Sequence, residues 1–163
     1  MKQSNEKNSE TNHKQLKIVP ATKDNLPQIL EIGKESISAD WTLGFLLADI
    51  DKEDTYFIAA MHGEDALGFA VFREVGDDGE LLQIATRKDA RCSGVGSVLL
   101  ENVLEYAQSK SLHKVFLEVR KSNTPAIKLY EKFGFSEIRT RKAYYDNPTE
   151  DALILARVIV KEG

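Results

Sequence analysis

The chain has 163 residues, of which 42% are hydrophobic, 29% charged and 8% aromatic. These values are close to the averages of globular proteins and the length suits a single domain, so collagen-like and wholly disordered chains are excluded. With 22 Lys and Arg against 26 Asp and Glu, the formal charge of -4 offers no basic footprint for a phosphate backbone. We therefore predict no nucleic-acid partner.

The single cysteine, Cys92, and three scattered histidines provide neither a disulfide nor metal-ligand spacing. We expect no metal and a reducing, cytoplasmic location. The segment 1–15 holds almost no apolar side chain, and no later apolar run approaches the roughly 18 residues of a membrane span. Residues 1–14 are predicted to be a flexible tail and 15–163 a single domain without a membrane partner. The oligomeric state is left open.

The first half of the sequence predicts a strand, two helices and an antiparallel meander. Apolar residues precede Pro20, and a helix start at Thr22 to Asn25 is followed by an apolar stripe. Hairpin-type turns at 62–65 and 76–79 separate short runs of alternating residues. In chain order we expect a strand at 16–19, helices beginning near 22–25 and spanning about 39–50, and antiparallel strands at 56–61, 66–73 and 80–86.

The second half predicts a crossover unit. Apolar residues recur at three- and four-residue spacing from Val95 to Ala107, which indicates the longest helix. The apolar run 115–119 that follows predicts a strand buried on both faces and parallel to the strand before the helix. The unit predicts a mixed α/β fold: a mostly antiparallel sheet with one parallel crossover, flanked by about four helices.

The chain closes with a helix and two strands. Thr124 before Pro125 predicts a helix N-cap, and Gly134 predicts the end of that helix. We then expect a strand at 135–140, a polar loop, and an apolar strand at 152–160.

The segment from Arg91 to Gly96 lies between a predicted strand and the start of the long helix. Glycines there let the backbone approach a ligand, and the free N–H groups of a first helical turn favour a phosphate or pyrophosphate. A Walker loop and the complete dinucleotide fingerprint are both missing. An anion other than ATP or NAD is the favoured ligand, and a purely structural turn is the alternative.

Two polar side chains in apolar surroundings are candidates for acid–base chemistry. Glu118 interrupts an apolar strand, where a partly desolvated carboxylate suits a general base; the alternative is an ion pair with Arg120 or another cation. Tyr130 shares a helix face with Ile127 and Phe133, which also suits a core aromatic. A phenol with a reference pKa near 10 stays protonated at neutral pH and can protonate a departing thiolate.

Several linked motifs resemble the GNAT N-acetyltransferase superfamily. From Gln83 to Phe135, RCSGVG opening a long helix, LEVRKSN and PAIKLYEKFGF are similar to its coenzyme-A-binding half. LEVR followed by SN, LYEKFGF and a later YY before EDA most resembles RimI-type protein N-terminal alanine acetyltransferases, over about residues 81–157. The resemblance implies a GNAT fold, acetyl-CoA as co-substrate, and acetyl transfer to an amine such as the N-terminal α-amine of a ribosomal protein.

The resemblance also implies roles for individual residues. Glu118 falls at the position of the proton acceptor and Tyr130 at that of the proton donor, while Asn123 matches a coenzyme contact and Tyr144 and Tyr145 border the acceptor entrance. The implied pantetheine strand is Ile84, Ala85 and Thr86, and the implied pyrophosphate loop is Arg91, Cys92, Ser93, Gly94, Val95, Gly96 and Ser97.

Some residues depart from the family pattern. Thr86 replaces the valine that is usual at the end of the pantetheine strand, and Arg87 and Lys88 replace the Asp-Pro pair that usually follows. Cys92 and Ser93 replace bulkier, often basic residues of the loop. Because the coenzyme contacts expected from the strand are made by backbone, the coenzyme interpretation is retained. Cys92 has no histidine nearby in the sequence and is not expected to act as a nucleophile.

Two other functions stay open at this stage. One is a GNAT enzyme for a small-molecule amine, in which residues 144–151 would close over a small cavity. The other is a non-catalytic acyl-CoA-binding regulatory module, in which Glu118 would be salt-bridged and Tyr130 buried away from the thioester.

Overall fold

The structure is a computed structural model that describes residues 15–37 and 40–159. Seven strands in this part of the chain form a sheet of order β1-β2-β3-β4-β5-β7-β6. β4 and β5 are parallel, whereas β1–β2, β5–β7 and β6–β7 are antiparallel, which confirms the predicted class with its one parallel crossover. The strands are β1 (Leu16–Pro20), β2 (Thr55–His62), β3 (Asp65–Val75), β4 (Asp78–Thr86), β5 (Lys114–Arg120), β6 (Ser136–Tyr145) and β7 (Glu150–Val158).

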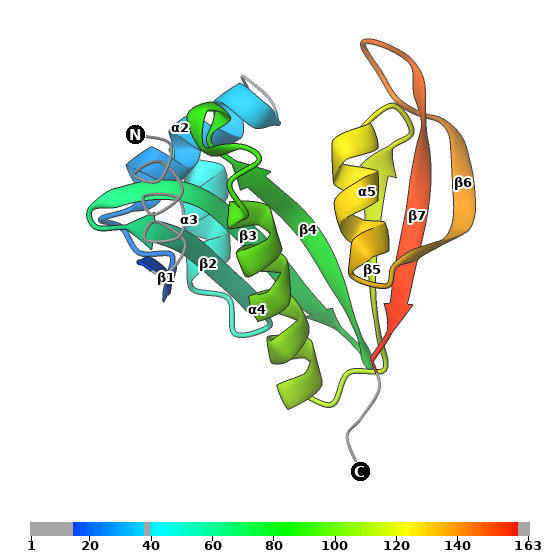
Figure 1. The fold of residues 1–163 in the computed structure, drawn as a ribbon, viewed down its shortest axis with the longest axis horizontal. Coiled ribbons are helices and arrows are strands. Elements are labelled where there is room, and N and C mark those ends of the chain that lie inside the picture. Colours follow the sequence, from blue (N-terminus) through cyan, green and yellow to red (C-terminus); the bar gives the residue numbers. More distant parts are fainter. Residues whose placement is uncertain (1–14, 38–39, 160–163) are drawn as a thin grey trace, which may run out of the picture. The chain divides into compact units, whose positions relative to one another are not determined.

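Four α-helices accompany the strands within the described residues (Figure 1). They are α2 (Leu26–Ser36), α3 (Leu43–Ile50), α4 (Val95–Ser109) and α5 (Thr124–Lys132), with a 3₁₀ turn η1 (Lys88–Ala90) before α4. Across residues 15–37 and 40–159, none of these helices has the length and apolarity of a membrane span. The expected tail at 1–14, Ala39 and Val160 lie outside the described residues.

The chain divides into two compact units. The first holds residues up to Phe72 together with Gln83–Val103, and the second holds Arg73–Leu82 together with Leu104 and the residues after it. β4 therefore contributes its last residues to the first unit and its first residues to the second.

In the first unit, the start of α4 packs closely against the sheet at Gly68. A Cβ added there would lie 2.8 Å from the carbonyl oxygen of Ala85 and 2.9 Å from Cγ1 of Val95. Val95 and Leu99 are both buried. Because only glycine fits this contact, Gly68 sets the distance between the first turn of α4 and the end of β4.

In the second unit, β5 has one buried and one half-exposed face, with Val115, Leu117 and Val119 inward and Phe116, Glu118 and Arg120 outward. Figure 1 shows α5 beside β5 and β7. The end of α5 lies on the inward face, because a Cβ at Gly134 would approach Nε of Arg157 to 3.5 Å and Arg157 is the β7 partner of Val115. The prediction of a strand buried on both faces is therefore wrong.

Several predicted boundaries change, among them those of α3, α5 and β6. α3 begins at Leu43, after an extended Thr42. The N-cap of α5 is Asn123 rather than Thr124, because the Asn123 side chain accepts the N–H of Ala126 at 3.3 Å. β6 continues to Tyr145, through residues expected to form a polar loop.

The extension of β6 has a physical cause that the sequence pattern does not show. Its residues are mostly exposed, and register shifts occur between Glu137 and Arg139 and between Arg141 and Tyr145. A bulged edge strand with both faces polar has no apolar alternation, so pairing with β7 alone defines it.

Gly68→Ala is expected to lower the free energy of unfolding by about 1–3 kcal/mol, because the new methyl meets a backbone carbonyl and a buried valine. Chemical denaturation measures the change. Gly44→Ala is the control, since its Cβ would lie 3.7 Å from Oγ1 of Thr42 in an exposed helix, where alanine is favoured over glycine. Equal loss in both variants would contradict the close-packing argument.

Candidate functional site

In the first unit, the candidate anion loop runs from Arg91 into α4. Two residues of the loop adopt positive φ angles, Cys92 at 63° and Gly94 at 90°. The first backbone hydrogen bond entering the helix is donated by the N–H of Val98 to the carbonyl of Gly94, at 3.1 Å. Within the described chain, the N–H groups of residues 92–97 donate to no backbone carbonyl or side chain. Such a run of unpaired donors at a helix start suits an anion.

The side chains of the same loop are used for internal contacts. Arg91 donates from Nη2 to Oγ of Ser36 at 3.0 Å and from Nε to the carbonyl of Thr86 at 3.4 Å. The Ser93 hydroxyl donates to the carbonyl of Ala90. These bonds tie the loop to α2 and to the end of β4, so the Arg91 and Ser93 side chains hold the loop in place while its backbone N–H groups stay unpaired.

In the second unit, Tyr130 lies inside α5 with 6% of its surface exposed. Its ring packs edge-on against Phe135, with 5.9 Å between ring centroids, and its hydroxyl forms no hydrogen bond to another described residue. Burial, and then the neighbouring Tyr145 phenol, raise the pKa of Tyr130 far above its ordinary value. The phenol is therefore protonated throughout the neutral range and can donate.

Glu118 forms an ion pair with Arg141 of β6. Nη1 of Arg141 lies 3.0 Å from Oε1 of Glu118, and the two side chains are 40% and 27% exposed. Of the alternatives weighed from sequence, pairing with a cation is the one observed, although the partner is Arg141 and not Arg120. Oε2 of Glu118 takes no part in this bond and can accept a proton.

The predicted acceptor residues join a second set of contacts on the same sheet. Tyr144 and Tyr145 pack edge to face, with centroids 5.1 Å apart, and stack on the guanidinium groups of Arg141 at 4.1 Å and Arg120 at 4.2 Å. Burial raises the pKa of Tyr145, and the charge of Glu118 raises it further.

Glu150 attaches this hairpin to the end of β5. Oε1 accepts the N–H of Ser122 at 2.6 Å, and Oε2 lies 3.6 Å from Nη1 of Arg120. The hydrogen bonds from Ser122, helped by Arg120, hold the pKa of Glu150 below its usual range.

The predicted residues thus fall into two sets. The strand and loop residues lie in the first unit, and Glu118, Asn123, Tyr130, Tyr144 and Tyr145 lie in the second. Within the second unit, Glu118 and Tyr130 come from different sides of β5 and share Tyr145 as an electrostatic neighbour. The described residues contain no group of three metal-ligating side chains.

Arg139, Arg141 and Lys142 beside Tyr144 and Tyr145 were expected from the sequence to contact peptide, but the pairing of Arg141 with Glu118 and the role of Glu150 were missed. The sequence signal for these two ion pairs was the presence of opposite charges 20 to 30 residues apart. Which charges pair depends on the register of β5, β7 and β6.

A model of the acetyltransferase (GNAT) family matches residues 24–135. The chain is 31% identical over 134 residues to the ribosomal protein bS18-alanine N-acetyltransferase of Escherichia coli K12, covering 81% of this chain and 90% of that enzyme. It is 30% identical over 149 residues to an N-alpha-acetyltransferase of Sulfolobus acidocaldarius, covering 83% of this chain and 88% of the relative.

Solved structures agree with these matches. The crystal structure of the ribosomal-protein-S18-alanine N-acetyltransferase from Escherichia coli has a TM-score of 0.82 at 29% identity and covers 91% of this chain and 96% of that chain. Arabidopsis thaliana NAA60 in complex with acetyl-CoA has a TM-score of 0.78 at 18% identity, covering 88% and 98%, and this likeness shows the fold. The expected GNAT fold is confirmed.

The buried phenol predicts a stability loss in alkali. Because the folded pKa of Tyr130 is raised, its contribution is complete below the unfolded pKa near 10 and is lost as the pH rises toward the folded value. Between pH 10 and 11, wild type should lose about 1 kcal/mol more unfolding free energy than Tyr130→Phe. Denaturant unfolding of both proteins at both pH values measures this difference. An equal loss of unfolding free energy in wild type and Tyr130→Phe would contradict the burial of the phenol.

Proposed function

Because this chain belongs to the acetyltransferase (GNAT) family, we propose that it transfers acetyl from acetyl-CoA to the α-amine of an alanine at a protein N-terminus, such as that of a ribosomal protein. The observation that carries the proposal is the Tyr130 phenol, which is largely buried in α5, is protonated at neutral pH, and has a hydroxyl that bonds to no described residue. A group kept protonated and free to donate is what a departing thiolate requires.

The coenzyme is held through its pyrophosphate in this proposal. The unpaired N–H groups of residues 92–97 are the donors, and the positive end of the α4 dipole adds to the attraction. The backbone of Ile84, Ala85 and Thr86 pairs with the pantetheine arm, and Asn123 makes the second coenzyme contact.

Transfer is direct and needs no acyl-enzyme. Glu118, itself or through a water molecule, takes a proton from the incoming ammonium. The neutral nitrogen attacks the thioester carbon, so that a C–N bond forms and the C–S bond breaks, and Tyr130 protonates the departing sulfur. Holding both substrates together supplies much of the rate acceleration.

The nature of the acceptor follows from similarity and from pKa arithmetic. The matched bacterial enzymes are named for an alanine α-amine on ribosomal protein bS18. At pH 7 an α-amine is about one tenth neutral, against about one part in two thousand for a lysine side chain. A carboxylate that already has an ion-pair partner is a sufficient base for the first and a weak one for the second. Tyr144 and Tyr145 line the approach of the acceptor peptide.

The ion pair of Glu118 is also what a non-catalytic acyl-CoA-binding module would have. Turnover separates the two functions. Release of coenzyme A thiol with an alanine-terminated peptide, and acetylation of that peptide seen by mass spectrometry, would support the enzyme. Tight acetyl-CoA binding without turnover on any amine would support the module, and turnover on small amines alone would support a small-molecule enzyme.

Tyr130→Phe and Glu118→Gln are expected to lower kcat by about 10²–10⁴-fold, because each removes one proton-transfer group while keeping its shape. Acetyl-CoA affinity, measured by calorimetry, should stay close to that of wild type. Phe135→Leu is a control for general loosening of the Tyr130 packing. If Tyr130→Phe kept full kcat, the proposed proton donor would be wrong.

Gly94→Ala should weaken acetyl-CoA binding at least tenfold, since alanine resists the φ of 90° that orients the loop N–H groups. Gly76→Ala is the matched control: Gly76 has a φ of 61° in open space, at the turn before β4. Both variants are expected to lose a similar amount of unfolding free energy. Only Gly94→Ala is expected to lose affinity for acetyl-CoA. Unchanged coenzyme affinity in both variants would contradict the assignment of the loop.

A further inference from the structure

Arg141 reaches Glu118 across the whole width of β7. Ala152 of β7 is the register partner of Arg120 on one side and of Arg141 on the other, and its side chain is fully buried. A methyl group at this position leaves room for the Arg141 side chain to pass over β7 and place Nη1 at 3.0 Å from Oε1 of Glu118. The position of the ion pair is therefore determined by the register of β5, β7 and β6.

The guanidinium of Arg141 is also held from its other side. It stacks on the ring of Tyr144 at 4.1 Å, and the Tyr144 ring packs edge-on against Tyr145. Arg141 thus connects the proposed proton acceptor with the residues proposed to meet the acceptor peptide.

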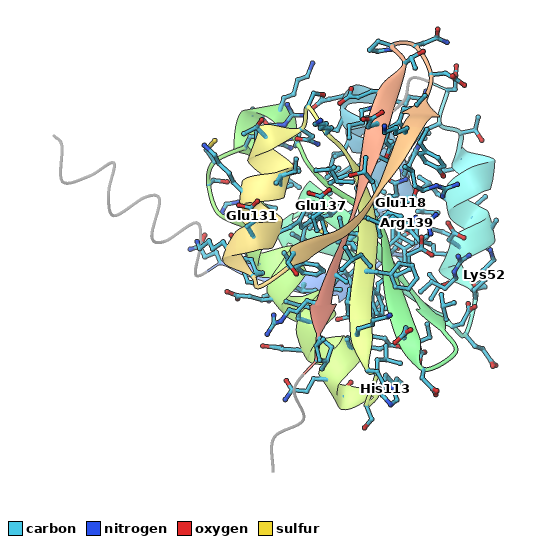
Figure 2. All side chains as sticks on the ribbon, turned by 90° about the vertical axis from the view of Figure 1, so that its right-hand side faces the viewer. Lys52, His113, Glu118, Glu131, Glu137 and Arg139 are labelled. Atoms are coloured by element: carbon cyan, nitrogen blue, oxygen red, sulfur yellow. The ribbon has the colours of Figure 1, made fainter. Side chains whose placement is uncertain are left out.

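Three arginines share a face of the sheet with Glu118, and they differ in their partners. Arg120 is the last residue of β5 and is paired with Glu150, so these two charges compensate. Arg139 of β6 occupies the same cross-strand row as Glu118, with Ile154 between them, and forms no ion pair with a described residue (Figure 2). Arg141 is therefore the guanidinium that contacts the Glu118 carboxylate, and Arg139 is a charge on the same face of the sheet without such a contact among the described residues.

An ammonium that approaches Oε2 of Glu118 therefore meets a carboxylate whose charge is already compensated by a guanidinium a few ångströms away. Two like charges at such a separation repel appreciably even near the surface, whereas a neutral amine feels no such repulsion. An α-amine loses its proton easily near pH 7, and a lysine ammonium does not.

We infer that Arg141 is a specificity-determining residue that favours amines which give up their proton readily near pH 7, such as N-terminal α-amines, over lysine ammonium groups. The inference rests on the proposed function, because it takes Glu118 as the proton acceptor. The selection is electrostatic and acts through the charge of Arg141 beside Glu118.

The test compares two peptides of one sequence. One has a free N-terminal alanine and no lysine, and the other has a blocked N-terminus and one lysine near it. The ratio of kcat/KM for the lysine peptide to that for the α-amine peptide is measured for wild type, Arg141→Met, Arg141→Lys and Arg139→Met. Melting temperatures establish that each variant is folded.

Arg141→Met should raise the ratio about tenfold, mainly through a lower KM for the lysine peptide, because Glu118 then attracts an ammonium without opposition. Arg141→Lys keeps the charge and should keep the ratio. Arg139→Met removes the same charge from the same strand without breaking a contact to Glu118, and should change the ratio less than about twofold.

An unchanged ratio in folded Arg141→Met, an equal change in Arg139→Met, or loss of activity on both peptides in Arg141→Met would overturn the inference and leave the proposed function standing. Wild type that acetylates neither peptide would overturn the proposed function and this inference with it.

Discussion

The position of β7 between β5 and β6 is the constraint on which the second unit depends. β7 gives each neighbour a register, and that register places Glu118, Arg120, Arg139 and Arg141 on one face of the sheet. Because Ala152 of β7 is small, Arg141 of β6 can reach Glu118 of β5 across β7. A half-exposed ion pair of this kind adds little to stability. In the proposed function its consequence is chemical, since the charge of Arg141 offsets the negative charge that Glu118 would present to an amine.

Polar groups without an internal partner define the remaining chemistry. The N–H groups of residues 92–97 and the hydroxyl of Tyr130 form no hydrogen bond to a described residue. Every fully buried polar side-chain atom of the described residues has a partner, so the Tyr130 hydroxyl oxygen is within reach of solvent. Unpaired donors are costly in a folded protein unless water or a ligand bonds to them. Both sets suit the family to which the chain belongs, the first for binding an anionic coenzyme and the second for giving up a proton.

The order of the elements and part of the candidate site could be predicted from local patterns, and the other site residues followed from the resemblance to the GNAT family. The long helix from Val95 follows from apolar spacing, the end of α5 from Gly134, and the loop chemistry from glycines before a helix. β6 was underestimated at its C-terminal end because its bulges and exposed polar residues erase the alternation that marks a strand. The N-cap of α5 was predicted at Thr124 and is observed at Asn123. Both residue types suit an N-cap, and the choice between them depends on where the chain leaves β5.

The state of each candidate side chain required the folded chain. Composition and spacing suffice for helices, turns and glycine loops, since these depend on residues within a few positions of one another. Whether Glu118 is paired, and with which arginine, depends on a strand that arrives more than twenty residues later, and whether Tyr130 is buried depends on the sheet beneath its helix. Long-range register, which no local pattern encodes, therefore decides which ionisable residues are paired and which are buried.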